Sequence, residues 1–117
     1  MPKLAVTDTA RQHLAERVRA SLGPDPRLTE KHMFGSLAFL LNGHILAGVR
    51  KDGTMLLSVG KAGDAAALAH PGVTPMIMRE RVMKGFVQLD TEAIESDDAL
   101  QFWLSTAERH VSTLPPK

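Results

Sequence analysis

The chain has 117 residues, a length that suits one compact domain, and 14 Lys and Arg residues stand against 13 Asp and Glu residues. The resulting formal charge of +1 argues against a strongly basic nucleic-acid-binding protein or a cationic membrane-surface protein. The sequence has no cysteine, which excludes disulfides, thiolate chemistry and cysteine-based zinc sites. Without a signal peptide or an apolar run long enough for a membrane span, we expect a soluble, cytoplasmic protein with a single domain over residues 1–117.

The first expected element is a helix that begins at Thr7 or Asp8, because either side chain can cap a first turn. Gly23-Pro24 is expected to end this helix. The following stretch, GPDPRLTEK, is predicted to be a loop because two prolines and a glycine disfavour a helix there. The apolar residues of the helix recur at i, i+4 spacing and are Ala10, Leu14, Val18 and Leu22.

Two turn signals organise the next part of the chain. Asn42-Gly43 is the dipeptide that a type I′ hairpin needs, and Asp52-Gly53 forms a second such signal. They predict a three-stranded antiparallel meander over 36–41, 45–50 and 54–59. With two-residue loops, one predicted face contains Leu37, Phe39, Leu41, Leu46, Gly48, Met55, Leu57 and Val59, and the other contains Ala38, Leu40, Ile45, Ala47, Val49, Leu56 and Ser58.

Both predicted faces of this meander are apolar, whereas a sheet with one wet face alternates apolar and polar residues. The second face therefore needs a cover. A helix of this chain and a second subunit are the two alternatives, so a homodimer is one expectation.

A short helix and two strands are expected to follow the meander. Asp64 is expected to cap the short helix in GKAGDAAALAH, and Pro71-Gly72 to end it. The segments VTPMIM and GFVQLD predict two strands, joined by the charged connection Arg79-Glu80-Arg81.

The last expected element is a long helix that begins at Ser96, whose side chain can cap the first turn. Two aspartates follow Ser96, where the positive end of the helix dipole favours them. The predicted order is α-βββ-α-ββ-α, an α+β two-layer sandwich with an antiparallel sheet. The apolar stripe of the long helix is Leu100, Trp103, Leu104, Ala107, Val111 and Leu114.

The sequence lacks the common motifs of catalytic and cofactor sites. Gly60-Lys61 has neither the first glycine nor the Ser or Thr of a phosphate-binding loop, and no nucleophile elbow or H-E-x-x-H motif occurs. Asp97-Asp98 is interpreted as a pair that favours the helix dipole rather than as a catalytic acid pair. We interpret the histidines, at positions 13, 32, 44, 70 and 110, as surface or capping residues because they show no metal-ligand spacing. The sequence therefore predicts a non-enzymatic protein without a metal or a cofactor.

Two segments, HMFGSLAFLLNGHILAGV and the stretch from PMIMRERVMKGFVQLD to the closing LPPK, resemble the N-terminal domain of the TfoX/Sxy family. The resemblance runs from about residue 30 to residue 117 and is typical of single-domain bacterial members. Ser36 stands where a second glycine usually follows M-F-G, and Ser58 where single-domain relatives tend to carry an arginine. The residues that carry the resemblance are Met33-Phe34-Gly35, Asn42-Gly43, Gly48-Val49, Val59-Gly60, Pro75-Met76, residues 83–87 and Leu114-Pro115-Pro116.

This resemblance implies a two-layer domain with an antiparallel sheet, similar to the secretion-chaperone-like folds. Named family members look like positive regulators of competence genes that act with a cyclic-AMP receptor protein at promoters. They also carry a C-terminal helical domain. For this chain the resemblance implies a regulatory or protein-interaction module, such as a transcriptional accessory protein, with a protein partner.

Three functions remain open at this point. The first is the protein-interaction module, whose candidate surface is Met33, Phe34, Gly35, Arg79, Arg81 and Lys84. The second is direct nucleic-acid binding through Lys31, His32, Arg79, Arg81 and Lys84, which is less favoured because the chain has few aromatic residues for base stacking. The third is a small-ligand site between sheet and helices, in which Lys84 holds an anion, His32 is a general base and Ser36 donates a hydroxyl.

Overall fold

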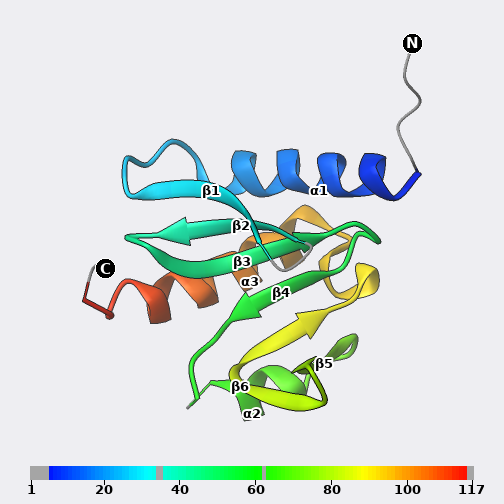
Figure 1. The fold of residues 1–117 in the computed structure, drawn as a ribbon, viewed down its shortest axis with the longest axis vertical. Helices are drawn as coiled ribbons and strands as arrows, with labels where there is room; N and C mark the ends of the chain where they lie inside the picture. Colours follow the sequence, from blue (N-terminus) through cyan, green and yellow to red (C-terminus); the bar gives the residue numbers. More distant parts are fainter. Residues whose placement is uncertain (1–5, 34–35, 62, 116–117) are drawn as a thin grey trace.

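The computed structural model describes residues 6–33, 36–61 and 63–115. Six strands form one sheet in the order β1-β2-β3-β4-β6-β5, and all neighbouring strands are antiparallel (Figure 1). This arrangement confirms the predicted α+β class and the antiparallel sheet. The elements are α1 (Val6–Leu22), β1 (Leu28–Met33), β2 (Ser36–Leu41), β3 (His44–Arg50), β4 (Met55–Ser58), α2 (Asp64–Leu68), β5 (Val73–Met78), β6 (Arg81–Leu89), the 3-10 helix η1 (Thr91–Ile94) and α3 (Asp97–Val111).

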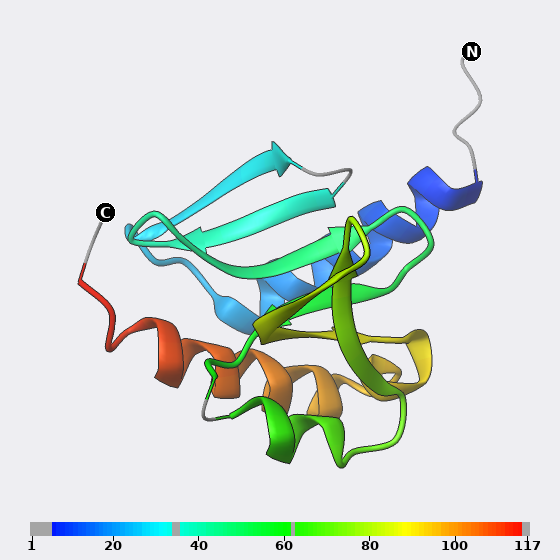
Figure 2. The same cartoon turned by 60° about the horizontal axis from the view of Figure 1, so that its bottom comes forward.

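The helices lie on one side of the sheet, so the molecule has two layers (Figures 1 and 2). The hydrophobic core fills the space between these layers, and α3 contributes Leu100, Trp103, Leu104, Ala107 and Val111 to it. The expected cap of this helix is present, because the Ala99 N–H donates to Ser96 Oγ at 3.0 Å. None of the described helices has both the length and the apolar content needed to cross a membrane.

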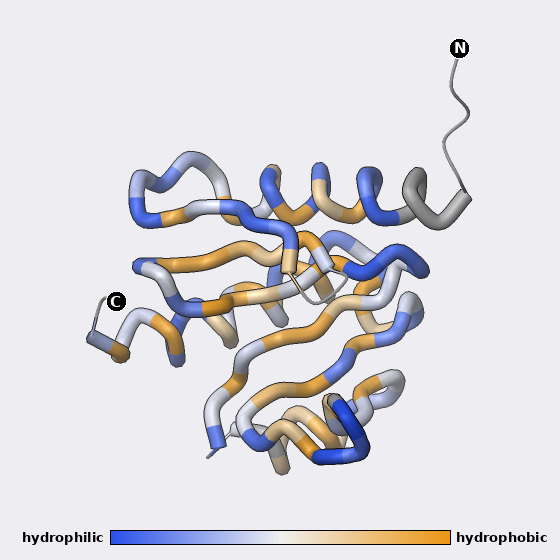
Figure 3. The backbone as a smooth tube through the Cα atoms, in the orientation of Figure 1, coloured by the Kyte–Doolittle hydropathy of each residue, from blue (hydrophilic) through white to orange (hydrophobic). Residues whose placement is uncertain are grey.

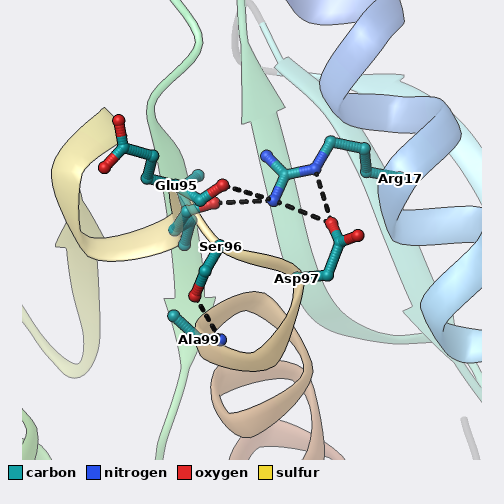
Figure 4. Close-up of polar contacts among 6 residues, drawn as sticks. Arg17, Glu95, Ser96, Asp97 and Ala99 are labelled. Atoms are coloured by element: carbon teal, nitrogen blue, oxygen red, sulfur yellow. Dashed lines mark hydrogen bonds and ion pairs between the residues drawn. The ribbon is translucent and has the colours of Figure 1, made fainter.

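Arg17 joins α1 to the N-terminus of α3 (Figure 4). Its Nη2 donates to the carbonyl oxygens of Ile94 and Glu95 at 2.9 and 3.1 Å, and its Nε donates to Asp97 Oδ1 at 3.2 Å. A planar guanidinium can serve several acceptors at once, so one side chain fixes the two long helices against each other.

Three helix and loop boundaries differ from the prediction. Helix α1 begins at Val6, so Thr7 and Asp8 lie inside it, and Gly63 rather than Asp64 occupies the N-cap of α2. The predicted loop GPDPRLTEK is wrong in its second half, where β1 begins at Leu28. The four middle side chains of β1 are exposed at the sheet edge, so this strand lacks the apolar alternation that would have indicated it.

The predicted register of the meander is wrong because β3 contains a β-bulge. Leu40 pairs with Ile45 while Phe39 pairs with Ala47, so one additional residue stands in β3. Since side chains alternate between faces, this residue moves Ala47 and Val49 to the helix-covered face with Phe39. Gly48 moves to the other face.

The face of the meander without helices is buried largely by contacts within the chain. Ala38 and Leu56 on this face are 2% and 8% exposed. The Leu56 side chain lies over Gly48, where an added Cβ would come within 2.9 Å of Leu56 Cγ. Arg50 of β3 reaches past β4 and donates from Nη1 to Gln88 Oε1 of β6 at 2.7 Å. A helix of this chain does not cover the face within the described residues, and the homodimer stays a prediction.

Candidate functional site

The β5–β6 hairpin consists of two parts that are separated by a break in β6. Residues 73–75 pair with residues 87–89, and Ile77 pairs with Val82 near the tip. Between these parts, a single residue of β5, Met76, stands opposite the four residues 83–86 of β6. Gly85 has a φ of +87°, and its carbonyl oxygen accepts the N–H groups of Val59 and Gly60 at 2.8 and 3.0 Å. A left-handed backbone at this point suits glycine and lets the chain leave the sheet.

Residues 76–84 therefore form a projecting hairpin, which we call the arm. Figure 2 shows the arm in yellow-green, standing up from the sheet on the side away from the helices. Strand β4 pairs with β6 over residues 86–89, below the arm. Met76 at the base of the arm is 2% exposed and anchors it in the fold.

The arm exposes a small apolar surface. Ile77 and Val82 lie directly opposite each other and are each 58% exposed, and Met83 beside them is 37% exposed. Cross-strand neighbours of this kind lie on the same face of a hairpin. Exposed apolar groups that are gathered together, rather than scattered, are typical of interaction surfaces.

The tip of the arm is charged and strained. Arg79 and Glu80 have φ values of 52° and 65°, in the left-handed region that non-glycine residues seldom adopt. Figure 3 shows this turn as a strongly hydrophilic segment. Within the described residues, the side chains of Arg79, Glu80 and Arg81 are exposed and form no hydrogen bond or ion pair. Backbone strain that no local contact offsets is often found where a segment serves function rather than stability.

The residues that the sequence analysis placed on one candidate interaction surface lie apart in the structure. Met33 ends β1 at one edge of the sheet, whereas Arg79 and Arg81 belong to the hairpin at the opposite edge, with β2, β3 and β4 between. Strands β1 and β6 run in the same direction, so Met33 and the arm tip also lie at opposite ends of the sheet. These residues do not form one surface. Phe34 and Gly35 lie outside the described residues.

The residues of the predicted nucleic-acid site and of the predicted small-ligand site also lie apart. Lys31 and His32 lie on β1, at the opposite edge from the arm, so the five predicted phosphate contacts do not converge. Ser36 is 2% exposed at the end of β2 away from Lys84, and its Oγ has no hydrogen-bond partner among the described residues. Hence Lys84, His32 and Ser36 do not form a ligand site.

Lys84 instead lines a pocket with residues that the sequence analysis did not group with it. The pocket has a volume of about 380 Å³ and opens where β3 and β4 separate beyond the Ala47–Leu57 pair. It lies between this end of the sheet, the base of the arm and the C-terminal end of α3. Its lining residues are His44, Ile45, Ser58, Gly60, Lys61, Lys84, Gly85, Phe86, His110 and Leu114.

Two contacts fix the walls of this pocket. Gly60 has a φ of +79°, and a Cβ added there would come within 2.6 Å of His110 Cε1, so the imidazole packs on a bare backbone. His44 Nε2 lies 2.6 Å from the carbonyl oxygen of Pro115, which holds the segment after α3 against the start of β3. Two segments that line this pocket, Gly60-Lys61 and residues 83–87, were singled out from the sequence, but nothing in the sequence indicated that they lie side by side.

The one-sided helical layer and the six-stranded antiparallel sheet define a two-layer α+β domain. The family model for the TfoX N-terminal domain matches residues 20–111, and the chain belongs to this family. This match confirms the resemblance found in the sequence and extends from the end of α1 to the end of α3. Neither the curated proteins nor the solved structures contain a match.

Proposed function

We propose that this chain is a non-enzymatic regulatory domain that binds a protein partner through the arm. The exposed Ile77–Val82 pair carries the proposal, because it places two β-branched apolar side chains in solvent on a projecting hairpin. Burying both side chains in a partner would remove apolar area from water, at roughly 25 cal/mol per Å². Membership of the TfoX N-terminal domain family, which is not a known enzyme family, supports a regulatory role.

The charges of the arm indicate the chemistry of the partner. Arg79, Arg81 and Lys84 stand against one carboxylate, that of Glu80. Complementary charges around an apolar contact favour the correct partner and speed association. We therefore expect a protein surface with an apolar groove and an acidic rim.

The arm suits a protein better than a nucleic acid. Its exposed residues include two branched aliphatic side chains and no aromatic ring, so it offers no platform for base stacking. Glu80 also stands between the two arginines at the tip and would repel a phosphate backbone.

The partner is expected to contact side chains rather than extend the sheet. β5 is an edge strand, but Pro75 in its middle lacks the N–H that an added strand would need. Strand addition along the full length of β5 is thereby disfavoured.

The proposal can be tested by quantitative affinity capture from a lysate of the source organism, followed by calorimetry with the purified partner. The variant I77S/V82S should lose at least about tenfold in affinity, because both apolar contacts are removed. R79E/R81E should weaken binding more at low salt than at high salt. The matched control is Phe102→Ser, which alters an apolar side chain that is 48% exposed on α3 and should bind normally.

Equal binding by I77S/V82S and the wild type would contradict the proposal. Fluorescence anisotropy with labelled duplex and single-stranded DNA provides the second readout. Saturable DNA binding that R79E/R81E abolishes, with no protein partner captured, would assign the arm to nucleic acid instead.

A further inference from the structure

The pocket below the arm carries an inference that does not depend on partner binding. We propose that this pocket binds a small organic anion, with its carboxylate or phosphate group between Lys61 and Lys84 and its apolar body against Phe86. The site is distinct from the exposed Ile77–Val82 pair, and its ligand is a small molecule rather than a macromolecule.

The charges around the pocket favour an anion. The titratable side chains that line it are Lys61, Lys84, His44 and His110, and none of the described lining residues is acidic. This concentration of basic groups is local, because the chain as a whole has a formal charge of +1. Lys61 and Lys84 are exposed and form no ion pair within the described residues. Two unpaired ammonium groups at one pocket attract an anionic group, and each of them can donate charge-assisted hydrogen bonds to it.

The remaining lining residues favour an organic ligand over a bare inorganic ion. Ile45, Phe86 and Leu114 are partly buried and give the pocket an apolar wall. Its volume of about 380 Å³ falls in the range of small-molecule sites, roughly 300–1,000 Å³, which have mostly apolar walls and a few polar groups. Ser58, only 6% exposed, adds a hydroxyl to the lining.

The pocket walls are held in place by the fold. Lys84 precedes Gly85, whose carbonyl oxygen accepts the N–H of Gly60, and Lys61 follows Gly60. The two lysines are therefore attached to neighbouring backbone segments joined by a hydrogen bond. His110 packs on Gly60 and closes the side toward α3. Because little backbone rearrangement is needed, the ordering cost of binding is mainly that of the two exposed lysine side chains.

Amide-detected NMR titration with phenyl phosphate tests the proposal directly. We expect saturable shifts that are largest at Gly60, Lys61, Gly85 and Phe86. Lys61→Gln and Lys84→Gln should each weaken binding about five- to tenfold, since each removes one charged partner in a solvent-accessible site. The matched control is Lys51→Gln, at the exposed turn after β3 and the other end of the sheet, which should change the Kd less than about twofold. Dispersed spectra of all three variants establish that they fold.

Three further titrants separate the parts of the proposal. Benzoate that binds with the same dependence on Lys61 and Lys84 supports the anion site and shows that a carboxylate suffices. Benzyl alcohol that binds as tightly as phenyl phosphate would overturn the role of charge. Inorganic phosphate that binds as tightly would overturn the role of the apolar wall.

Two results would overturn the proposal entirely: no saturable shift with either aromatic anion at millimolar concentration, or equal weakening by Lys51→Gln. The variant I77S/V82S leaves every lining residue unchanged and should retain phenyl phosphate binding. Failure of this proposal is therefore distinguishable from failure of the partner-binding proposal.

Discussion

The β2–β3 hairpin and the arm have similar turns but very different support. Asn42 and Gly43 adopt φ values of 53° and 86°, and Arg79 and Glu80 adopt 52° and 65°. In the first hairpin, the Asn42 N–H donates to the Arg27 carbonyl at 3.0 Å, and the adjoining strands are mostly buried. In the arm, the side chains of residues 79–84 are exposed.

This difference shows which hairpin serves the fold. Asn-Gly tolerates positive φ at both positions, so the first hairpin has little strain and continues into the core. Arg-Glu is poorly suited to the same geometry, and the exposed side chains near it gain little from packing. A turn with unfavourable residues and an unburied apolar pair contributes little to stability, which is consistent with a binding role for the arm.

The largest expected effect comes from shortening a buried side chain in the β2–β3 hairpin, compared with an exposed one in the arm. Leu41 is fully buried, so Leu41→Ala should lower the free energy of unfolding by about 2–5 kcal/mol. Val82→Ala, at a position 58% exposed, should change it by no more than about 0.5 kcal/mol. Urea unfolding followed by the fluorescence of the buried Trp103 measures both. A loss above about 2 kcal/mol for Val82→Ala would show that the arm belongs to the core.

The second expected effect concerns the helices that cover the first hairpin. Arg17→Ala should lower the free energy of unfolding by about 1–3 kcal/mol, because three acceptors at the start of α3 lose their donor. Arg17→Lys should restore less than half of this, since one ammonium group cannot reproduce the planar contacts. Arg19→Ala is the control, because its pair with Glu30 is exposed and should contribute no more than about 1 kcal/mol. Similar losses for Arg17→Ala and Arg19→Ala would contradict the role of Arg17.

Substitutions in the turns of the two hairpins test whether the backbone of the arm turn is more strained than that of the β2–β3 turn. R79N/E80G should raise the free energy of unfolding by about 1 kcal/mol, because both new residues accept positive φ more readily. Gly43→Ala should lower it by about 1 kcal/mol for the opposite reason. No change in thermal or urea unfolding for R79N/E80G would show that the arm turn stores no strain.

The smallest expected effect concerns Asp25 and Arg27, near the Asn42-Gly43 turn. The Arg27 guanidinium and backbone N–H hold the pKa of the Asp25 carboxyl at about 2, below its ordinary value of 3.8. Because the folded-state pKa is depressed, the contribution of this pair to stability is complete above about pH 4 and is lost as the pH falls through about 2. Arg27→Gln should raise the Asp25 pKa toward 3.8, as measured by carboxyl-detected NMR. A wild-type value near 3.8 would show that the pair does not persist in solution.

Local sequence signals predicted the parts of the fold that short-range chemistry determines. Asn42-Gly43 located the first hairpin, and Ser96 located the start of α3. Strand β1 was missed because most of its residues are polar and exposed, although the strand that it pairs with, β2, follows it directly in the chain. The bulge in β3 was missed because a single additional residue leaves no compositional trace.

The candidate sites were predictable only in part. The charged connection around Arg79 and Arg81 was identified, but its projection depends on Gly85, whose backbone conformation is fixed through contacts with Val59 and Gly60. The pocket joins β3, β4, β6 and the end of α3, which lie far apart in the sequence. His110 was interpreted as a surface or capping residue because its neighbour Gly60 is distant along the chain.

Pro75 and the break at Gly85 also affect how the protein behaves at high concentration. An open sheet has two edges at which identical molecules can stack into fibres. At one edge, Pro75 removes a donor and the arm turns the strand out of the sheet; at the other, Glu30 and Lys31 place opposite charges along β1. Neither edge offers a flat, uncharged strand to a second copy, so both edges disfavour aggregation through strand pairing.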